Sequence, residues 1–280
     1  MNYYSVIGLD KEPFSTSPDP AFFYESRQHH SVLVKAMIEI RLKRGLSVIF
    51  GDVGTGKTTL SRKLFQMLKE REDIIFGMIL DPVFETEELF LEALLRTFKI
   101  QYTGGNNILD YKDAVKKFLY EKGVSENKTV VLLIDEGQKL NDASIEVLRS
   151  LLNYETNEFK LLQLVLLGQL ELLPRLKRIQ NVWDRISMKY IINPLNENET
   201  REMIMFRLKQ AGYRFPKALF SDEAISEIYR YTRGCPRKVA LICHEAVCQL
   251  VARSDAFMDV PLVREIIDND CNVKEAVADA

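Results

Sequence analysis

The fold of this 280-residue chain is decided by one stretch, Gly51-Asp52-Val53-Gly54-Thr55-Gly56-Lys57-Thr58. The stretch has the pattern G-x-x-x-x-G-K-[ST], and it lies between an apolar run, Leu46 to Phe50, and a segment with helical periodicity. Glycines allow the backbone to curl so that successive N–H groups point at phosphate oxygens, and the following helix presents its positive N-terminal end. The stretch therefore predicts a phosphate loop that binds a nucleoside triphosphate.

Two side chains of this loop have predicted roles of their own. Lys57 is expected to reach the β- and γ-phosphates, and the Thr58 hydroxyl is expected to hold a Mg²⁺ ion. The alternative is a glycine-rich strand-to-helix turn without a ligand, which the complete pattern in this context disfavours. The predicted nucleotide-binding residues are Gly51, Asp52, Val53, Gly54, Thr55, Gly56, Lys57, Thr58 and Thr59, the last of which continues the helix.

A second motif concerns what happens to the nucleotide. The apolar run from Val130 to Ile134 ends in two acids, Asp135 and Glu136, and a strand is apolar at every position only when both of its faces are buried. Asp135 is expected at the Mg²⁺ ion, and Glu136 is placed to orient and deprotonate an attacking water. The pair predicts a hydrolase. The alternatives are two solvated acids at a strand end and a small-molecule kinase, which would not require Glu136.

Composition limits the class of protein. With 46% hydrophobic and 28% charged residues the chain is too apolar to be disordered. A net charge of −2 creates no general basic field, so nucleic acid would have to bind at a local patch. No apolar run approaches the roughly 18 residues of a transmembrane helix, and the N-terminus lacks the pattern of a signal peptide, which predicts a cytoplasmic protein. The four cysteines contain no C-x-x-C pair, so reduced thiols are expected.

Short apolar runs alternate with helical periodicities along the first two thirds of the chain. This alternation predicts an α/β fold in which a parallel sheet has helices on both faces. After Asn193-Pro194-Leu195 the remainder reads as helices, so we expect an α/β nucleotide-binding domain with the N-terminal segment over residues 1–194 and a helical lid domain over 195–280. Beyond the run before the phosphate loop, the predicted strands are 74–80, 130–134, 162–168 and 186–192. The predicted helices are 31–43, 59–70, 87–98, 111–121, 144–153, 197–211, 221–232, 236–253 and 260–269.

Two arginines stand at informative positions. Arg185 directly precedes the last predicted strand, from where it could reach the γ-phosphate held by a neighbouring subunit; such an arginine finger contributes about 10³ to 10⁵ in rate. Arg237 begins a helix of the lid, from where it could touch the phosphates of its own subunit. Arg175 and Arg178 are rival candidates for the finger. For each, the alternative is an ordinary surface or salt-bridging arginine.

In this order, the motifs resemble those of the AAA+ ATPases, and within them the ExeA (GspA) family. The resemblance covers about residues 3 to 268. It rests on the N-terminal residues Tyr4, Gly8-Leu9, Glu12-Pro13-Phe14-Ser15, Ser17-Pro18-Asp19-Pro20 and Phe23-Tyr24, on the phosphate loop, and on Leu166-Leu167-Gly168-Gln169, Arg185-Ile186 and Pro236-Arg237.

The resemblance implies roles for single residues and an ATP-driven homo-oligomer with ATP bound between subunits. Carried over, Lys57 and Thr58 are Walker A, Asp135 and Glu136 are Walker B, Gln169 is sensor 1, Arg185 is the finger and Arg237 is sensor 2. Many AAA+ proteins have Asn or Thr where this chain has Gln169, so a polar residue at a strand end is the alternative there. That the nucleotide is ATP follows from the resemblance alone.

The pathway stays open at this point. Full-length secretion members of the family continue into a transmembrane segment and a peptidoglycan-binding domain, whereas this sequence ends at Ala280. Similar stand-alone ATPases of the TnsC, TniB and MuB group assemble on double-stranded DNA and recruit a transposase, and we expect an ATP switch of this kind. The alternatives are the ATPase core of a type II secretion protein with secretion-system partners, and a partner-recruiting switch that does not bind DNA.

Sequence signals for DNA are weak. Basic residues gather at Lys35, Arg41, Lys43 and Arg44, and again at Lys112, Lys116, Lys117 and Lys122. Clusters of this size are more often solvated faces than phosphate contacts.

Overall fold

The computed structural model describes residues 3–17, 19–102, 105, 107–214, 218–253 and 257–278. Pro18 of the N-terminal motif lies outside these residues. By its internal contacts the chain divides into two units, which are described one at a time. The first, here called the helical unit, comprises Met1–Ser26, Gly54–Thr59 and Asn193–Ala280; the second, the sheet unit, comprises Arg27–Val53 and Leu60–Ile192.

The sheet unit is built on one five-stranded sheet in the order β2-β3-β4-β1-β5, and every pairing is parallel. The strands are β1 (Leu46–Gly51), β2 (Ile74–Ile79), β3 (Thr129–Ile134), β4 (Leu162–Gly168) and β5 (Ile186–Ile192). Phe50 of β1 pairs with Gly168 of β4, and Ile134 of β3 pairs with Leu166. Because the strands are parallel, the residues that follow β1, β3 and β4 all emerge at one edge of the sheet.

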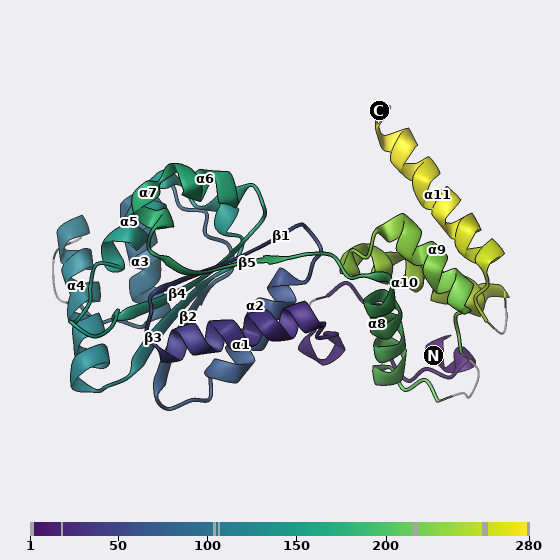
Figure 1. Cartoon of the computed structure of the whole chain (residues 1–280), viewed down its shortest axis with the longest axis horizontal. Coiled ribbons are helices and arrows are strands. Elements are labelled where there is room, and N and C mark those ends of the chain that lie inside the picture. Colours follow the sequence, from purple (N-terminus) through teal and green to yellow (C-terminus); the bar gives the residue numbers. More distant parts are fainter. Residues whose placement is uncertain are drawn as a thin grey trace. The chain divides into compact units, whose positions relative to one another are not determined.

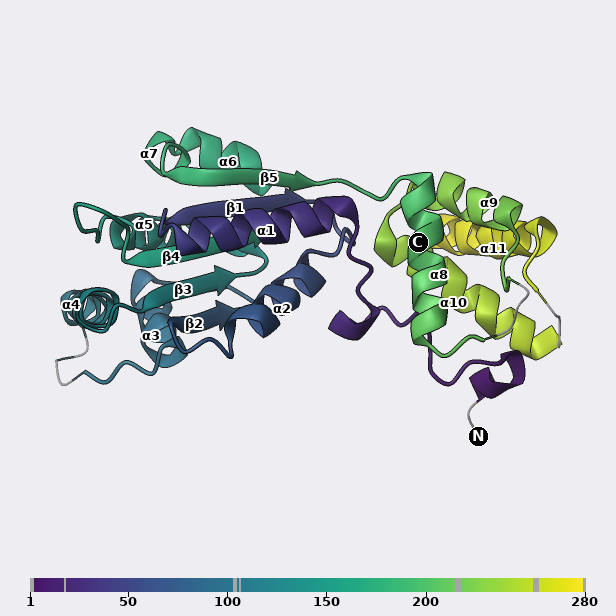
Figure 2. The same cartoon turned by 60° about the horizontal axis from the view of Figure 1, so that its bottom comes forward.

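Helices cover both faces of this sheet, as predicted (Figure 1). Helices α1 (Arg27–Arg41) and α2 (Lys57–Leu68) lie on one face, and α3 (Glu87–Thr97) and α5 (Asp142–Leu151) lie on the other, which Figure 2 shows from a second direction. The predicted α/β fold is confirmed. The sheet unit also contains α4 (Ile108–Tyr120), α6 (Leu172–Arg178) and α7 (Gln180–Trp183), with short turns of helix at Glu121–Ser125 and Gly137–Lys139.

Helices α6 and α7 are absent from the sequence-based prediction. They have seven and four residues, which is too short for a hydrophobic period to show, since such patterns need a window of about 11 residues or more.

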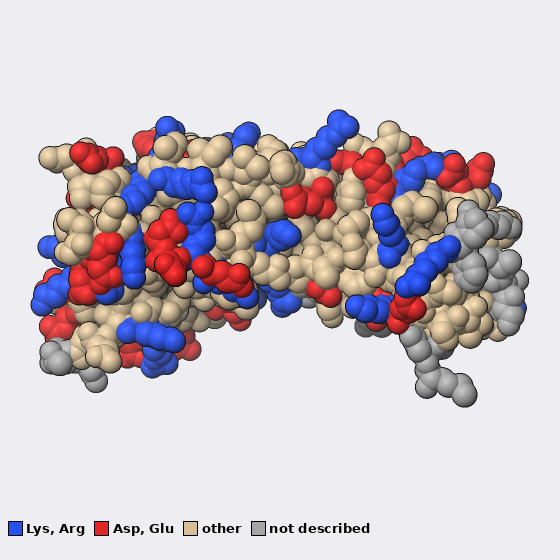
Figure 3. All heavy atoms as spheres, turned by 90° about the horizontal axis from the view of Figure 1, so that it is seen from below, with Lys and Arg blue, Asp and Glu red and all other residues tan. Residues whose placement is uncertain are grey.

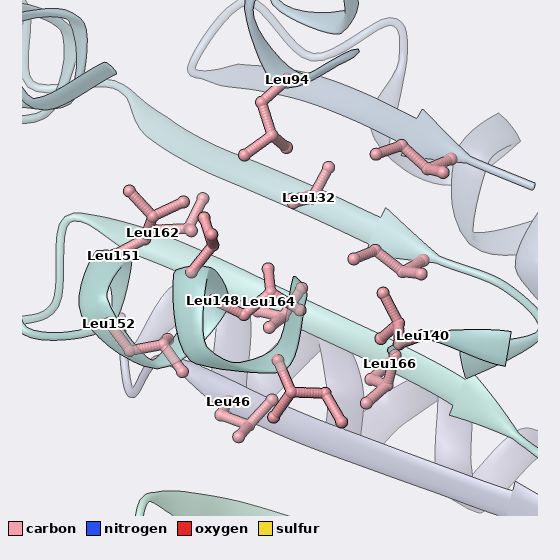
Figure 4. Close-up of a cluster of buried hydrophobic side chains, with 14 of the residues drawn as sticks. Leu46, Leu94, Leu132, Leu140, Leu148, Leu151, Leu152, Leu162, Leu164 and Leu166 are labelled. Atoms are coloured by element: carbon pink, nitrogen blue, oxygen red, sulfur yellow. The ribbon is translucent and has the colours of Figure 1, made fainter. Parts of the chain in front are cut away.

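Leucine dominates the core between the sheet and its helices. Strands β3 and β4 are buried along almost their whole length because helices cover both faces, which explains their unbroken apolar sequence. Figure 4 shows leucines from strands and helices meeting in this core. They are Leu46, Leu94, Leu132, Leu140, Leu148, Leu151, Leu152, Leu162, Leu164 and Leu166.

The helical unit contains α8 (Glu197–Gln210), α9 (Asp222–Thr232), α10 (Pro236–Arg253) and α11 (Val260–Ala278). The periodicity predicts all four, but α11 continues beyond its predicted end at residue 269. Local capping explains where two of them begin. Asn196 and Glu199 form a reciprocal capping box at the start of α8, and the Ser221 hydroxyl accepts from a backbone N–H at the start of α9.

The N-terminal segment belongs with these helices. Phe14 is buried against Phe220, with ring centroids 6.1 Å apart at nearly right angles, and the backbone N–H of Asp10 donates to Ala211 O. Tyr4 and Leu9 join the same core. The sequence interpretation had placed this segment in the nucleotide-binding domain; its apolar side chains instead bury among α8, α9 and α10. The division into two domains at residue 194 remains a prediction.

None of the helices within the described residues combines the length and the apolar character needed to cross a bilayer.

Candidate functional site

The predicted phosphate loop has the backbone that its glycines require. Gly54 and Gly56 have φ values of +82° and +96°, a region that residues with a Cβ rarely adopt. A Cβ on Gly54 would also come within 2.8 Å of the Arg237 Cβ atom. The backbone N–H of Arg237 donates to Gly54 O at 3.2 Å. The structure therefore brings Arg237, the residue predicted to touch the phosphates of its own subunit, directly against the loop.

The remaining loop residues differ in exposure. Gly51 ends β1 and is buried, Asp52 and Val53 are exposed, and Thr55 is buried. Lys57 is the first residue of α2 and is only 5% exposed. Thr58 and Thr59 follow it as half-buried residues in the first turn.

Asp135 lies at the end of β3 and is 1% exposed. Its carboxylate accepts a hydrogen bond from the Ser61 hydroxyl of α2 at 3.1 Å and another from the Glu136 backbone N–H at 2.9 Å. Ser61 is absent from the residues predicted from sequence. A signal was available, because Ser61 stands four residues after Lys57 and so shares a face of the helix with it.

Thr58 and Asp135 each carry an oxygen of the kind that Mg²⁺ prefers, and their shared role as its ligands remains a prediction. Mg²⁺ prefers oxygen ligands and usually takes one or two from the protein, the rest coming from water and substrate phosphates. No group of three or more His, Cys, Asp or Glu side chains that could hold a metal occurs in the described part of the chain.

Glu136 has an unusual backbone. Its φ of +52° and ψ of 38° place it in the left-handed region, which costs a residue with a Cβ roughly 1–2 kcal/mol. Such strain tends to persist where function needs it. The Glu136 carboxylate accepts from the side-chain amide of Gln138 at 2.6 Å, and the backbone N–H of Gln169 donates to the same Gln138 side chain at 3.0 Å.

Gln169 therefore contacts Gln138 through its backbone N–H. Among the described residues its side chain makes no hydrogen bond, so its predicted sensor role remains a prediction. Gln138 was not predicted from sequence, because nothing in its spacing distinguishes it from an ordinary loop glutamine.

The three candidate finger arginines have different surroundings. Arg185 is half-buried and donates to Asn181 O and, at 3.0 Å, to Asn153 Oδ1. Arg175 donates to Gln138 O at 3.1 Å and pairs with Asp142 at 2.8 Å. Arg178 is exposed and makes no hydrogen bond or ion pair within the described ranges. Of the three, Arg178 therefore has the fewest polar contacts within the described residues, whereas Arg185 and Arg175 each have two.

Both basic clusters are largely engaged inside the chain. The surface in Figure 3 likewise shows basic side chains standing among acidic ones. The cation–π contacts are Lys35 over Tyr190, Lys43 over Phe159 and Lys116 over Tyr154, and the ion pairs are Arg44 with Glu39, Lys112 with Glu87, and Lys122 with Glu121 and Glu126. These contacts agree with the expectation that clusters of this size are solvated faces rather than phosphate-binding sites.

Comparison with known proteins gives one family model and one curated relative. A family model described as an AAA domain matches residues 40–176. General secretion pathway protein A of Aeromonas hydrophila is 35% identical over 260 residues. The match covers 90% of this chain and 45% of that relative, so the chain spans less than half the length of the protein it resembles.

Solved structures share the fold at low identity. The ORC2 protein of Aeropyrum pernix, solved as ADPNP–ADP complexes, matches with a TM-score of 0.66 and 17% identity over 92% of this chain and 71% of that one. The ORC1 protein of the same organism, solved with DNA, matches with a TM-score of 0.64 and 14% identity over 92% and 69%. At these identities the likeness concerns the fold alone.

Proposed function

The chain belongs to the AAA+ proteins, and we propose that it binds ATP together with Mg²⁺ and hydrolyses it. One observation carries this proposal. The helix that begins with Lys57 donates from its next turn, through Ser61, to the buried carboxylate of Asp135 at the end of β3. A helix that starts at a phosphate loop is thereby fixed against the acid expected at the metal ion.

The expected chemistry divides among few residues. The loop N–H groups and Lys57 bind the phosphates, and Thr58 and Asp135 hold the Mg²⁺ ion, which when bound neutralises charge on the phosphates. Glu136 orients a water for attack on the γ-phosphate and accepts its proton. Arg237, whose backbone N–H donates to Gly54 O, is expected to contribute positive charge to phosphates held by the loop, and its contact with Gly54 supports this role.

Two variants test this assignment. Lys57→Ala is expected to abolish ATP binding, measured by titration with a fluorescent ATP analogue, whereas Lys63→Ala on the same helix should bind normally. Glu136→Gln is expected to bind ATP as wild type does and to turn it over about 10² to 10⁴ times more slowly, which is the usual contribution of a general base. Normal ATP affinity in Lys57→Ala would refute the phosphate-loop assignment.

We also propose a homo-oligomer in which ATP lies between subunits. The support is the position of Arg185 directly before β5, together with the AAA+ resemblance. Arg185 would act on the γ-phosphate of a neighbouring subunit after leaving Asn181 and Asn153. Arg178, exposed and without polar contacts among the described residues, is the rival.

For the pathway, the relation to general secretion pathway protein A supports a role as the ATPase portion of a secretion-type assembly. The engaged basic clusters give no added support to the transposition-type role expected from sequence. The test is the ATPase rate and particle size of the purified protein, with and without double-stranded DNA at one fixed salt concentration. A rate and size indifferent to DNA support the secretion-type role; DNA-stimulated turnover with ATP-dependent assemblies on the duplex would support the transposition-type switch instead.

A further inference from the structure

Gln138 lies between the two acids of the β3 end and the end of β4, and no predicted role accounts for it. It belongs to the short helical turn Gly137–Lys139 and is half-buried. Its side-chain amide nitrogen donates to Glu136 Oε2 at 2.6 Å, and its amide oxygen accepts from the Gln169 backbone N–H at 3.0 Å. One side chain therefore links the expected general base to the neighbouring strand.

The orientation of this amide follows from chemistry. A backbone N–H can only donate, so the group facing Gln169 must be the Gln138 oxygen. The amide NH₂ must then face Glu136, whose ionised carboxylate can only accept. Both ends of the amide are satisfied in this orientation, and the reverse orientation would break both hydrogen bonds.

Close packing holds the linkage in place. A Cβ on Gly137 would lie 2.5 Å from Leu166 Cδ1 and 3.1 Å from Leu167 O, so the loop after β3 runs tightly over the end of β4. The Gln138 carbonyl is in turn bound by Arg175, which also pairs with Asp142. The backbone and the side chain of Gln138 are thus both fixed.

We infer that Gln138 is a positioning residue for ATP hydrolysis, which holds the Glu136 carboxylate in the orientation from which it activates water. This inference rests on the proposed function. Glu136 already has a left-handed backbone, and a glutamate side chain has three rotatable bonds, so without a partner its carboxylate would sample many orientations. A general base must stay within hydrogen-bond reach of its water. The amide of Gln138 limits the carboxylate to one place.

The key variant is Gln138→Glu. It keeps an oxygen that can accept from the Gln169 N–H but replaces the donor to Glu136 with a second carboxylate. If Gln138 served only to tie the loop to β4, this variant would keep wild-type activity. If it positions Glu136, kcat should fall at least about tenfold, a part of the roughly 10² to 10⁴ that a general base supplies, with KM for ATP changed less than about twofold.

A double variant separates positioning from general damage. Because Gln138 acts through Glu136, adding Gln138→Glu to Glu136→Gln should lower kcat no further, whereas independent effects would multiply. Gln138→Met, similar in size and without an amide, should behave as Gln138→Glu does and serves if the latter fails to fold. Folding of each variant is checked by urea unfolding.

The outcomes are distinct. Three results would overturn the inference and leave the ATPase assignment intact. They are a wild-type kcat in Gln138→Glu, a change confined to KM, and a kcat in the double variant that falls below that of Glu136→Gln by the full factor seen for Gln138→Glu alone. Absence of Mg²⁺-dependent turnover in the wild-type protein would instead refute the proposed function itself.

Discussion

The hydrogen bond from Ser61 to Asp135 can be tested with two serine-to-alanine changes in the same unit. The Ser61 hydroxyl is fully buried and donates to the Asp135 carboxylate at 3.1 Å. The Ser144 hydroxyl on α5 is equally buried, yet it has no hydrogen-bond partner among the described residues. The two substitutions remove the same atom from the same degree of burial, so they differ chiefly in the hydrogen bond.

The two variants are expected to change the free energy of unfolding differently. A hydrogen bond to a charged group stabilises a folded protein by about 1.5–3 kcal/mol, so Ser61→Ala should lower the free energy of unfolding by about that much. An unpaired buried hydroxyl is itself unfavourable, so Ser144→Ala should be neutral or raise the free energy of unfolding by up to about 1 kcal/mol. With a urea slope of about 2 kcal/mol/M, the two midpoints should differ by roughly 1 M.

The assay is urea unfolding followed by tryptophan fluorescence. The chain has one tryptophan, Trp183, and it packs against the core of the sheet unit that also contains Ser61, Ser144 and Asp135. The signal therefore reports the unit in which the changes are made, which matters because a chain of two units need not unfold in one step. Equal midpoints for the two variants, with unchanged slopes, would refute the reasoning.

Two further predictions use other parts of the chain. Gly234 has a φ of +69°, and a Cβ on it would lie 1.8 Å from Leu195 O, so Gly234→Ala should destabilise the helical unit by more than the ~1–2 kcal/mol of a left-handed residue. Cys243 is fully buried, and burial raises the pKa of its thiol, so alkylation of Cys243 requires the helical unit to open. Mass spectrometry should find this alkylation at least about tenfold faster in the variant, and an unchanged rate would contradict the prediction. If Arg185 acts between subunits, mixing Arg185→Ala with Glu136→Gln protein should restore some activity, measured as phosphate release, because some interfaces then combine an intact finger with an intact base. Activity that is only the average of the two separate proteins would argue for Arg178 or for a monomeric enzyme.

Local patterns in the sequence determined the phosphate loop and the main features of the sheet unit. The phosphate loop, the five strands and the position of Asp135 and Glu136 after β3 could be predicted because each depends on neighbouring residues. A glycine-rich turn needs its glycines at fixed spacing, and a strand covered on both faces needs an unbroken apolar run. These signals do not depend on what the chain does elsewhere.

The tertiary structure decided which partner each polar group has. Ser61 meets Asp135 across 74 residues, and Gln169 meets Gln138 across 31. Helical spacing puts Ser61 on the same face as Lys57, but no motif identifies Asp135 as its partner, and nothing in the sequence marks the second pairing. The N-terminal segment is similar: Phe14 is an obvious apolar side chain, but only the fold shows that it buries against Phe220 of the helical unit.

The physical reason is the range of the interactions. Periodicity records whether a side chain is buried, because burial repeats with the helix or the strand, but it does not record against which distant segment it is buried. A hydrogen bond depends on donor and acceptor lying within about 3 Å at a suitable angle. The sequence by itself therefore determined the phosphate loop and the acids of this protein, and only the folded chain decided that Ser61 holds Asp135 and that Gln138 holds Glu136.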